Sequence, residues 1–513
     1  MTDYDVVVCG LGPVGQLLAL LLGDHGVRTL AFDRAAAPYP LPRAAVLDDE
    51  VLRILQSVGL DAAVLAESQV QPRASIVTAA GRAVEVLSAQ DGLLGHPPLI
   101  SINQPAVERA LLGALPARTS VQVRRSLTLD AVDRRAERVD VYVRPTGGGR
   151  SERISARYLV GCDGGGSAVR ARLQVPFVGR TAAQRWVVVD ATVDRPLRKV
   201  PHPHFVGRAE RPIVTLPMSP GRHRWEWMLH PGEDPAPFLQ PDAIRRGVDE
   251  WLDGETATIE RAIVYTFHTR TAATWRRGRV LLAGDAAHVM PPFAGQGFSS
   301  GARDAANLAW KLAAVLDGAP DALLDSYEQE RRPHVAAMQR TANMMGGFVQ
   351  ATSPRRVRLR DAWLSAIDGT RVQTWLAGNV KPLPTYGAGA FAERPHRLPF
   401  RRTVGALFPQ SGRLDDRLGF GWAAVAVDDV SRSLLADAGI TVADPGADGA
   451  WLTTRGVDWA LLRPDRFVFA AGGPADVATA CQAWRRLVAP DRRTGEGSVK
   501  VRDAASIRAA VIA

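Results

Sequence analysis

Cysteine is scarce in this chain: Cys9, Cys162 and Cys481 are the only three in 513 residues. Cysteines so few and so scattered exclude a disulfide framework and a cysteine-based zinc site, and they fit a reducing compartment. Lysine is also rare, since it supplies four of the 63 basic residues. The arginines are spread among acids along the chain, so the net charge of +10 forms no basic stripe of the kind that tracks nucleic acid. We therefore expect no nucleic-acid partner.

Long hydrophobic runs are missing as well. The longest, Leu17 to Leu22, is far too short to span a membrane, and Asp3 and Asp5 stand where a signal peptide would need basic residues. We therefore expect a cytoplasmic protein without membrane contact. A chain of this length with 46% hydrophobic and 23% charged residues is typical of a globular protein with two or three domains.

The first 33 residues predict a βαβ unit. A β-branched run over 5–9 leads into a glycine-rich turn, leucines at helical spacing follow over 16–24, and a second apolar run over 27–32 ends at Asp33. Two parallel strands joined by a helix begin a doubly wound α/β fold. The N-terminal segment therefore predicts a Rossmann-like domain.

The turn of this unit has the spacing Gly10-x-Gly12-x-x-Gly15. The first glycine permits a tight turn, the second lets backbone approach a pyrophosphate, and the third lets the helix pack on the strand. The helix N-terminus then offers free N–H groups to the phosphates. Asp33 can accept ribose hydroxyls and would repel a 2′-phosphate, so FAD and NAD remain open and NADP is disfavoured at this site. The predicted contacts here are Gly10, Gly12, Pro13, Gly15, Asp33 and Arg34.

Two later motifs decide between FAD and NAD by resemblance. The segment Asp163-Gly-x-x-Ser-x-Val-Arg and the segment Gly284-Asp-Ala-Ala-His-x-x-Pro-Pro-x-x-Gly-Gln-Gly resemble the second and third fingerprints of the group A flavoprotein monooxygenases, the relatives of para-hydroxybenzoate hydroxylase. The resemblance implies FAD. The flavin contacts that it adds are Arg43, Gln104, Asp163, Gly284, Asp285, Pro292, Gly295, Gln296 and Gly297.

The third motif also has a physical interpretation. Asp285 can accept a ribityl hydroxyl, and the two prolines make a rigid loop. A helix expected to begin near Ser299 would point its N-terminal dipole at the flavin ring and stabilise the reduced form. Family members often have Met-Asn after the last glycine, where this chain has Phe298-Ser299, so contacts to the pyrimidine edge of the ring are left open.

Shorter segments resemble one branch of the family. Leu41-Pro-Arg-Ala, Arg224-Trp-Glu-Trp-Met-Leu-His-Pro-Gly and Asp304-Ala-Ala-Asn-Leu-Ala-Trp-Lys are similar to segments of 3-(3-hydroxyphenyl)propionate hydroxylases and related phenol and polyketide hydroxylases. These relatives carry a thioredoxin-like C-terminal domain. The tail of this chain has no Cys-x-x-Cys, so packing or contact within a homodimer would be its role.

The expected fold is therefore α/β, with a Rossmann-like FAD-binding domain of the para-hydroxybenzoate hydroxylase type. The predicted divisions are 1–175 and 276–390 for the FAD-binding domain, 176–275 for an inserted β-sheet substrate domain, and 391–513 for the thioredoxin-like domain.

The resemblance implies an enzyme in which NADH or NADPH reduces FAD, O2 adds at flavin C4a, and the hydroperoxide hydroxylates a phenolic or polyketide-like aromatic compound. A phenol with a pKa of about 10 needs help to ionise at neutral pH. No catalytic residue or general base is assigned. Candidate substrate residues in the middle sheet are Trp225, Trp227, Tyr265 and His268, with Arg208, Arg211 and Arg222 as partners for a substrate carboxylate. His202 and His204 have no nearby third ligand in the sequence, so no metal is expected.

Two alternatives stay open. Trp225-Glu-Trp227 suggests a flavin halogenase, but His230 stands where halogenases have proline, and residues 1–198 lack the lysine that such an enzyme would need. A flavin-binding scaffold or sensor without hydroxylase activity is the other.

Overall fold

The computed structural model describes residues 2–88, 93–379 and 384–488. Strand β1 (Tyr4–Cys9) lies inside the first sheet because its valines are buried on both faces, which suits a central parallel strand. It pairs in parallel with β2 on one side and β11 on the other. The order of the sheet is β17 (Arg276–Arg277), β18 (Val280–Leu282), β11 (Glu152–Gly161), β1, β2 (Thr29–Phe32) and β8 (Val121–Arg124). In addition, β10 (Val139–Pro145) pairs antiparallel with β11, and β9 (Leu127–Arg134) pairs antiparallel with β10.

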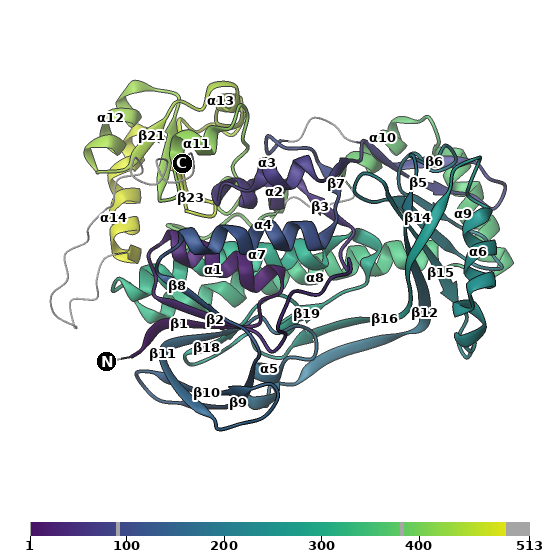
Figure 1. The fold of residues 1–513 in the computed structure, drawn as a ribbon. Helices are drawn as coiled ribbons and strands as arrows, with labels where there is room; N and C mark the ends of the chain where they lie inside the picture. The colour runs from purple at the N-terminus through teal and green to yellow at the C-terminus, as the bar shows by residue number, and fades with distance from the viewer. Residues whose placement is uncertain (1, 89–92, 380–383, 489–513) are drawn as a thin grey trace.

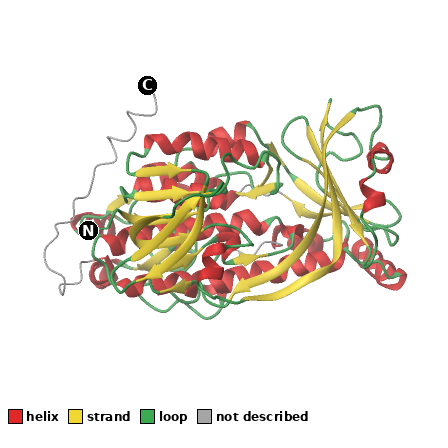
Figure 2. Cartoon of the chain, turned by 60° about the horizontal axis from the view of Figure 1, so that its bottom comes forward, coloured by secondary structure: helices red, strands yellow, loops and turns green. Residues whose placement is uncertain are grey.

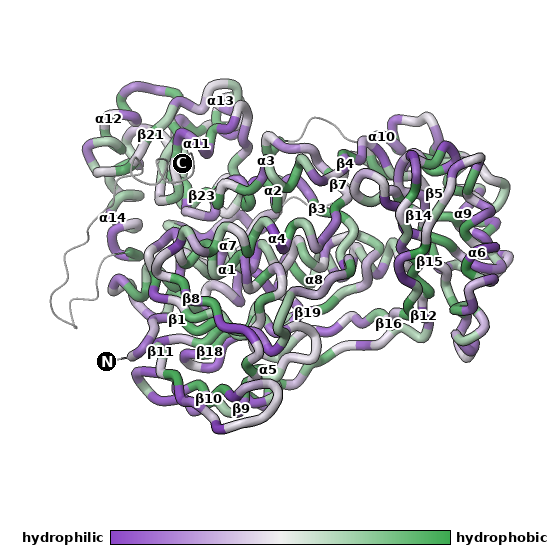
Figure 3. Tube along the Cα trace, viewed as in Figure 1, coloured by the Kyte–Doolittle hydropathy of each residue, from purple (hydrophilic) through white to green (hydrophobic). Residues whose placement is uncertain are grey.

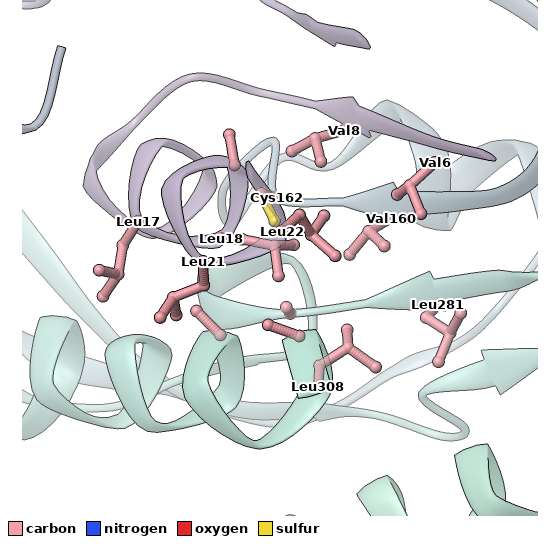
Figure 4. Packing of buried hydrophobic residues seen from close by; sticks show 14 of the residues in the cluster. Val6, Val8, Leu17, Leu18, Leu21, Leu22, Val160, Cys162, Leu281 and Leu308 are labelled. Carbon is pink, nitrogen blue, oxygen red and sulfur yellow. The ribbon is translucent and has the colours of Figure 1, made fainter. Parts of the chain in front are cut away.

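Helices cover this sheet on the side of α1 (Pro13–Asp24). Leu17, Leu18 and Leu22 of α1 are fully buried, and Figure 4 shows Leu18 and Leu22 beside Cys162 and Val160, on the side of α1 that faces the sheet. Figure 3 shows hydrophobic residues concentrated in these interior elements. The helices of this part are α1, α2 (Asp49–Ser57), α3 (Asp61–Ala66), α4 (Gln104–Ala114), α5 (Ala168–Arg172), α7 (Gln296–Leu316) and α8 (Asp325–Val349). The expected βαβ opening is confirmed.

A second sheet lies at the other end of the molecule (Figure 1). Its order is β19 (His288–Val289), β16 (Ala257–Ala272), β12 (Phe177–Val193), β15 (Arg222–Leu229), β14 (Ile213–Pro217), β13 (His204–Val206), β5 (Arg73–Val77) and β6 (Ala83–Ser88). Figure 2 shows the two longest strands running from one part of the molecule into the other. Helix α6 (Pro241–Asp249) packs against the outer face, and α9 (Pro354–Ile367) and α10 (Arg371–Asn379) follow α8.

One predicted boundary does not follow the sheets. Strands β5 and β6 lie inside the segment 1–175, yet β5 pairs with β13 of the second sheet and β6 pairs with β5. The insertion expected over 176–275 is therefore completed by an earlier hairpin. A small sheet of β3 (Val46–Asp48), β7 (Leu99–Ser101) and β4 (Gln69–Val70) stands between the two parts.

The C-terminal part forms a four-stranded sheet. In the order β21 (Thr441–Ala443), β20 (Ala423–Ala426), β22 (Trp459–Leu462) and β23 (Val468–Gly472), the first pair is parallel and the other two pairs are antiparallel. Its helices are α11 (Leu414–Leu418), α12 (Asp429–Asp437), α13 (Gly449–Thr453) and α14 (Val477–Val488). With α12 between the parallel strands and α14 after the last strand, this is the topology expected of a thioredoxin-like domain.

A buried ion cluster joins this domain to the core. Glu330 of α8 accepts hydrogen bonds from Arg463 at 2.8 and 2.9 Å and from Lys311 of α7 at 2.8 Å, and all three side chains are fully buried. The domain is therefore packed against α7 and α8. No helix within the described ranges is long and apolar enough to cross a membrane.

Candidate active site

A cavity of about 780 Å³ lies between the two sheets. Its wall combines the glycine turn after β1, the loop 33–46, the second and third motifs, the inner face of the second sheet and one side of α8. Segments that are far apart in the sequence therefore meet around one space.

The glycine turn has the geometry that its spacing predicts. Gly10 has φ +102°, and a Cβ there would lie 2.6 Å from the carbonyl oxygen of Cys162. At Gly15 a Cβ would lie 1.9 Å from the carbonyl oxygen of Gly10, so α1 packs directly on the turn. At Gly12, in contrast, a Cβ would meet no atom within 4 Å, because this residue and Pro13 face the cavity at the N-terminus of α1. The turn thus brings uncapped backbone N–H groups to the cavity wall.

Asp33 lies at the end of β2 on the same wall. Its carboxylate accepts hydrogen bonds from the backbone N–H groups of Leu11 and Ala35, each at 2.7 Å, which fixes it beside the glycine turn. Each carboxylate oxygen keeps a lone pair for another donor. Arg34 follows on the cavity wall. This position can receive a ribose and its neighbouring phosphate.

Gln104, at the start of α4, fixes the loop that carries Arg43. Its Oε1 accepts hydrogen bonds from the backbone N–H groups of Arg43 and Ala44, at 3.2 and 2.7 Å, and its Nε2 donates to Glu108 at 2.7 Å. Burial raises the pKa of Glu108. Arg43 and Gln104 both line the cavity, but the polar ends of Gln104 are already used within the protein.

The second motif is built around Asp163, another residue of the cavity wall. Its carboxylate accepts hydrogen bonds from Ser167 Oγ at 2.5 Å and from the backbone N–H of Val169 at 3.1 Å, and burial raises its pKa. Arg170 of α5 donates to the carbonyl oxygen of Ala286 at 2.8 Å. The second motif therefore supports the third.

In the third motif, Asp285, Pro292, Gly295 and Gly297 line the cavity. Asp285 is exposed to that space, and the surrounding protein raises its pKa by desolvation. Gly295 has φ +64° and stands too close to Val46 for any side chain, whereas a Cβ at Gly297 would meet no atom within 4 Å. The backbone at position 297 is thus open to a flat ligand.

One detail of this motif differs from expectation. Helix α7 begins at Gln296 and not near Ser299, because the left-handed Gly295 forms its N-cap and lets the first turn start at once. Gln296 lines the cavity, and its side chain also donates to Asp48 at 3.1 Å and accepts from Arg303 at 2.8 Å.

A second buried cluster holds Gly284, which lies beneath the cavity. Asp304 of α7 accepts hydrogen bonds from the N–H of Gly284 at 3.0 Å, from His288 at 2.6 Å and from Arg331 at 2.8 Å. Burial alone would raise the pKa of Asp304, but the charges of His288 and Arg331 outweigh it and lower that pKa. The loop is thus fixed through an ionised carboxylate.

The four proposed substrate residues do not line the cavity. Trp225 is fully buried in the cluster on the outer face of the second sheet, and Trp227 packs against the same cluster beside α6. Tyr265 accepts a hydrogen bond from Arg261, and His268 pairs with Thr181 on the long strands. The two tryptophans lie away from the cavity because alternate residues of a strand face opposite ways, and the tryptophans take the outer face.

The three arginines suggested for a substrate carboxylate are paired elsewhere. Arg208 pairs with Glu250, Arg211 with Glu233 and Arg222 with Glu260, and none of the three lines the cavity. The described residues hold no group of three side chains arranged for a metal ion.

Arg224 and Glu226 are the residues of β15 that do line the cavity. Arg224 donates to Asp190 at 2.6 Å and to the carbonyl oxygens of Pro42 and Arg43 at 2.9 and 3.0 Å. Arg261 also bonds Asp190 and the Pro42 carbonyl. Alternation along 222–229 could have revealed Arg224 and Glu226 as inward-facing residues, once the tryptophans between them were assigned to the core on the other face.

Comparisons with known proteins identify the family of the chain. Residues 3–342 match the family described as FAD binding domain. A 3-(3-hydroxy-phenyl)propionate/3-hydroxycinnamic acid hydroxylase of Mycolicibacterium gilvum is 38% identical over 85% of this chain and 78% of its own length. The hydroxylase of the same name from Escherichia coli O8 is 33% identical over 92% of each chain.

Solved structures show the same fold. Anhydrotetracycline hydroxylase OxyS from Streptomyces rimosus is 27% identical, with a TM-score of 0.74 over 95% of this chain and 99% of its own. A complex of aklavinone-11 hydroxylase with FAD and aklavinone is 24% identical, with a TM-score of 0.77 over 95% and 99% of the chains.

The fold and the cavity thus define a flavoprotein of the Rossmann-like class. The chain belongs to the FAD-binding domain family. The residues present fit FAD, because the open positions at Gly12 and Gly297 leave room for a pyrophosphate and a flat ring on one continuous wall.

Proposed function

We propose that this protein is an FAD-dependent monooxygenase that uses NADH or NADPH and O2 to hydroxylate a phenolic or polyketide-like aromatic compound. One observation carries the proposal: a single cavity joins the nucleotide-binding turn of the first sheet to the apolar inner face of the second. A cofactor and an aromatic substrate can therefore meet without an intervening wall.

FAD, when bound, supplies the redox chemistry, taking electrons from the nicotinamide and activating O2. The protein has to bind it, orient it and exclude water. Gly12 and the N-terminus of α1 would receive the pyrophosphate, Asp33 the ribose, and Asp285 the ribityl chain. The N-terminus of α7 would place a positive dipole end near the flavin ring, where the reduced form is negative.

Apart from Arg224 and Glu226 of β15, the part of the cavity wall that the second sheet forms is apolar. Phe205, Val214 and Leu216 come from the second sheet, and Phe293 and Met345 face them from the third motif and α8. The one arginine that the sheet adds, Arg224, already donates to Asp190 and to two carbonyl oxygens. We therefore propose a neutral phenol, rather than one with a carboxylate side chain, as the preferred substrate class.

We also propose a cytoplasmic location, which the thiols support. All three cysteines are free and buried, which fits the reducing cytoplasm, where we place the enzyme. A homodimer stays a prediction.

Turnover by the FAD-loaded protein tests the proposal. NADH or NADPH oxidation is followed with a panel of neutral and carboxylated phenols under ¹⁸O2, and products are analysed by mass spectrometry. We expect phenol-accelerated oxidation and a product with one labelled oxygen atom. Protein that binds no FAD, or that yields no labelled product with any phenol, would overturn the proposal.

A further inference from the structure

Glu226 is a carboxyl group on an otherwise apolar part of the cavity wall. On the neighbouring strands it stands opposite Val188 and Val214, and the next inward-facing residue of β15, Met228, belongs to the apolar cluster that holds Phe293. Burying a carboxyl among such residues is costly unless a partner satisfies it. A carboxyl group at this position therefore points to a partner that satisfies it.

No partner within the described protein satisfies Glu226. Its nearest cation is Arg224, at 3.8 Å, which is beyond hydrogen-bond distance. Arg224 is itself committed to Asp190 and to the Pro42 and Arg43 carbonyl oxygens. The carboxyl group of Glu226 therefore remains available to a ligand in the cavity.

We propose that Glu226 is the general base that accepts the phenolic proton of the substrate. The inference rests on the proposed function, because it needs a phenol in this cavity. The O–H bond of the phenol breaks, its electron pair stays on the phenol oxygen, and the proton bonds to Glu226 Oε. When the new C–O bond forms, the ring carbon loses its hydrogen as a proton, which ends in the water made from the second oxygen atom. Glu226 returns its own proton to the phenolic oxygen of the product before release, so protons balance over the cycle.

The charges around Glu226 suit this role. Burial raises the pKa of Glu226 to about 7, Arg224 on the same strand and Arg261 on β16 oppose that rise, and Asp190 on β12 adds to it. A phenol has a pKa of about 10, so only about one molecule in a thousand ionises in water at pH 7. A base whose pKa lies near the working pH is well matched for accepting that proton.

The first test needs no turnover. The affinities of the FAD-loaded protein for 3-propylphenol and propylbenzene are measured from flavin difference spectra between pH 5.5 and 8.5, and 2-naphthol and naphthalene form a second pair. We expect affinity for the phenols to rise about tenfold as the pH passes through about 7, because an ionised carboxylate is the stronger acceptor, while the hydrocarbons show no change.

Glu226→Gln should abolish this pH dependence. Glu260→Gln is the matched control: it removes a carboxylate from the same sheet, but one that pairs with Arg222 outside the cavity. The control should behave as wild type. A wild type without the pH-dependent preference for phenols, or a Glu226→Gln variant that keeps it, would overturn the inference.

The second test is turnover. At pH 7.5 we expect Glu226→Gln to lose about 100-fold in kcat, with KM little changed and activity rising only toward the pKa of the free phenol. Glu226→Asp, which keeps a carboxyl, should restore part of the pH profile. Wild-type kcat and pH profile in Glu226→Gln would overturn the role of Glu226 while leaving the proposed function standing. Glu226-dependent binding without oxygen in any product would overturn the proposed function and the catalytic role, and leave Glu226 as a binding group.

Discussion

Gly12 and Gly15 lie three residues apart in one turn, and we expect the same substitution to act on different properties at each. In Gly15→Ala the new Cβ would lie 1.9 Å from the Gly10 carbonyl oxygen, whereas ordinary contact begins near 3.4 Å, so α1 must move by about 1.5 Å. Overpacking of this kind costs about 3 kcal/mol, and the helix preference of alanine returns about 1 kcal/mol. We expect a net loss of about 2 kcal/mol in the free energy of unfolding.

In Gly12→Ala the Cβ meets no atom within 4 Å, and φ is −71°, which alanine adopts freely. The apoprotein should keep its stability to within about 1 kcal/mol. The methyl group would stand where the pyrophosphate approaches, so FAD affinity should fall at least about tenfold.

Urea unfolding of the apoproteins and flavin fluorescence titrations measure the two effects separately. Gly15→Ala should lose stability and FAD affinity together, whereas Gly12→Ala should lose affinity alone. FAD binding of wild-type strength in Gly12→Ala, or wild-type stability in Gly15→Ala, would refute the reasoning.

Three further predictions concern charged groups. Asp190→Asn leaves two buried arginines without their carboxylate, so urea unfolding should show a loss of about 3 kcal/mol, and a loss below about 1 kcal/mol would contradict this. Burial would raise the pKa of Glu330, but the charges of Arg463 and Lys311 outweigh burial and hold that pKa at about 2. The stability that ionised Glu330 adds is therefore present above pH about 4.3, the pKa of an unfolded glutamate, and is lost as the pH falls toward 2. Urea unfolding between pH 6 and 3 should show that loss, and Glu330→Gln should flatten it. Arg211→Ala should leave the KM for phenols unchanged within about twofold, because Arg211 pairs with Glu233 outside the cavity, and a large rise in KM would count against that placement.

The nucleotide end of the cavity could be predicted from the sequence because its constraints are local. The turn at Gly10 needs a residue with positive φ, and the packing at Gly15 excludes a side chain. The spacing of the glycines is therefore enough to predict the geometry of the turn. The long motif from Gly284 to Gly297 likewise lies within one loop and the start of one helix.

The substrate end could not be predicted in the same way. Which face of β15 meets the cavity depends on tertiary packing, because α6 and Trp225 share an apolar cluster on the opposite face of the sheet. The entry of β5 and β6 into the second sheet also depends on pairing over more than 100 residues. Alternation along a strand shows which residues share a face, but it does not show which of the two faces meets the cavity.

The two longest strands bear on how the molecule can move. β12 spans 17 residues and β16 spans 16, an antiparallel ribbon about 55 Å long whose pairing shifts register between Thr181 and Arg185 and again between Asp190 and Ala191. The regularly paired stretches of this ribbon are stiff, so any bending between the two ends of the molecule should occur at the irregular positions. Hydrogen exchange should then be slowest along the regular stretch from Arg185 to Asp190 and faster where the register shifts.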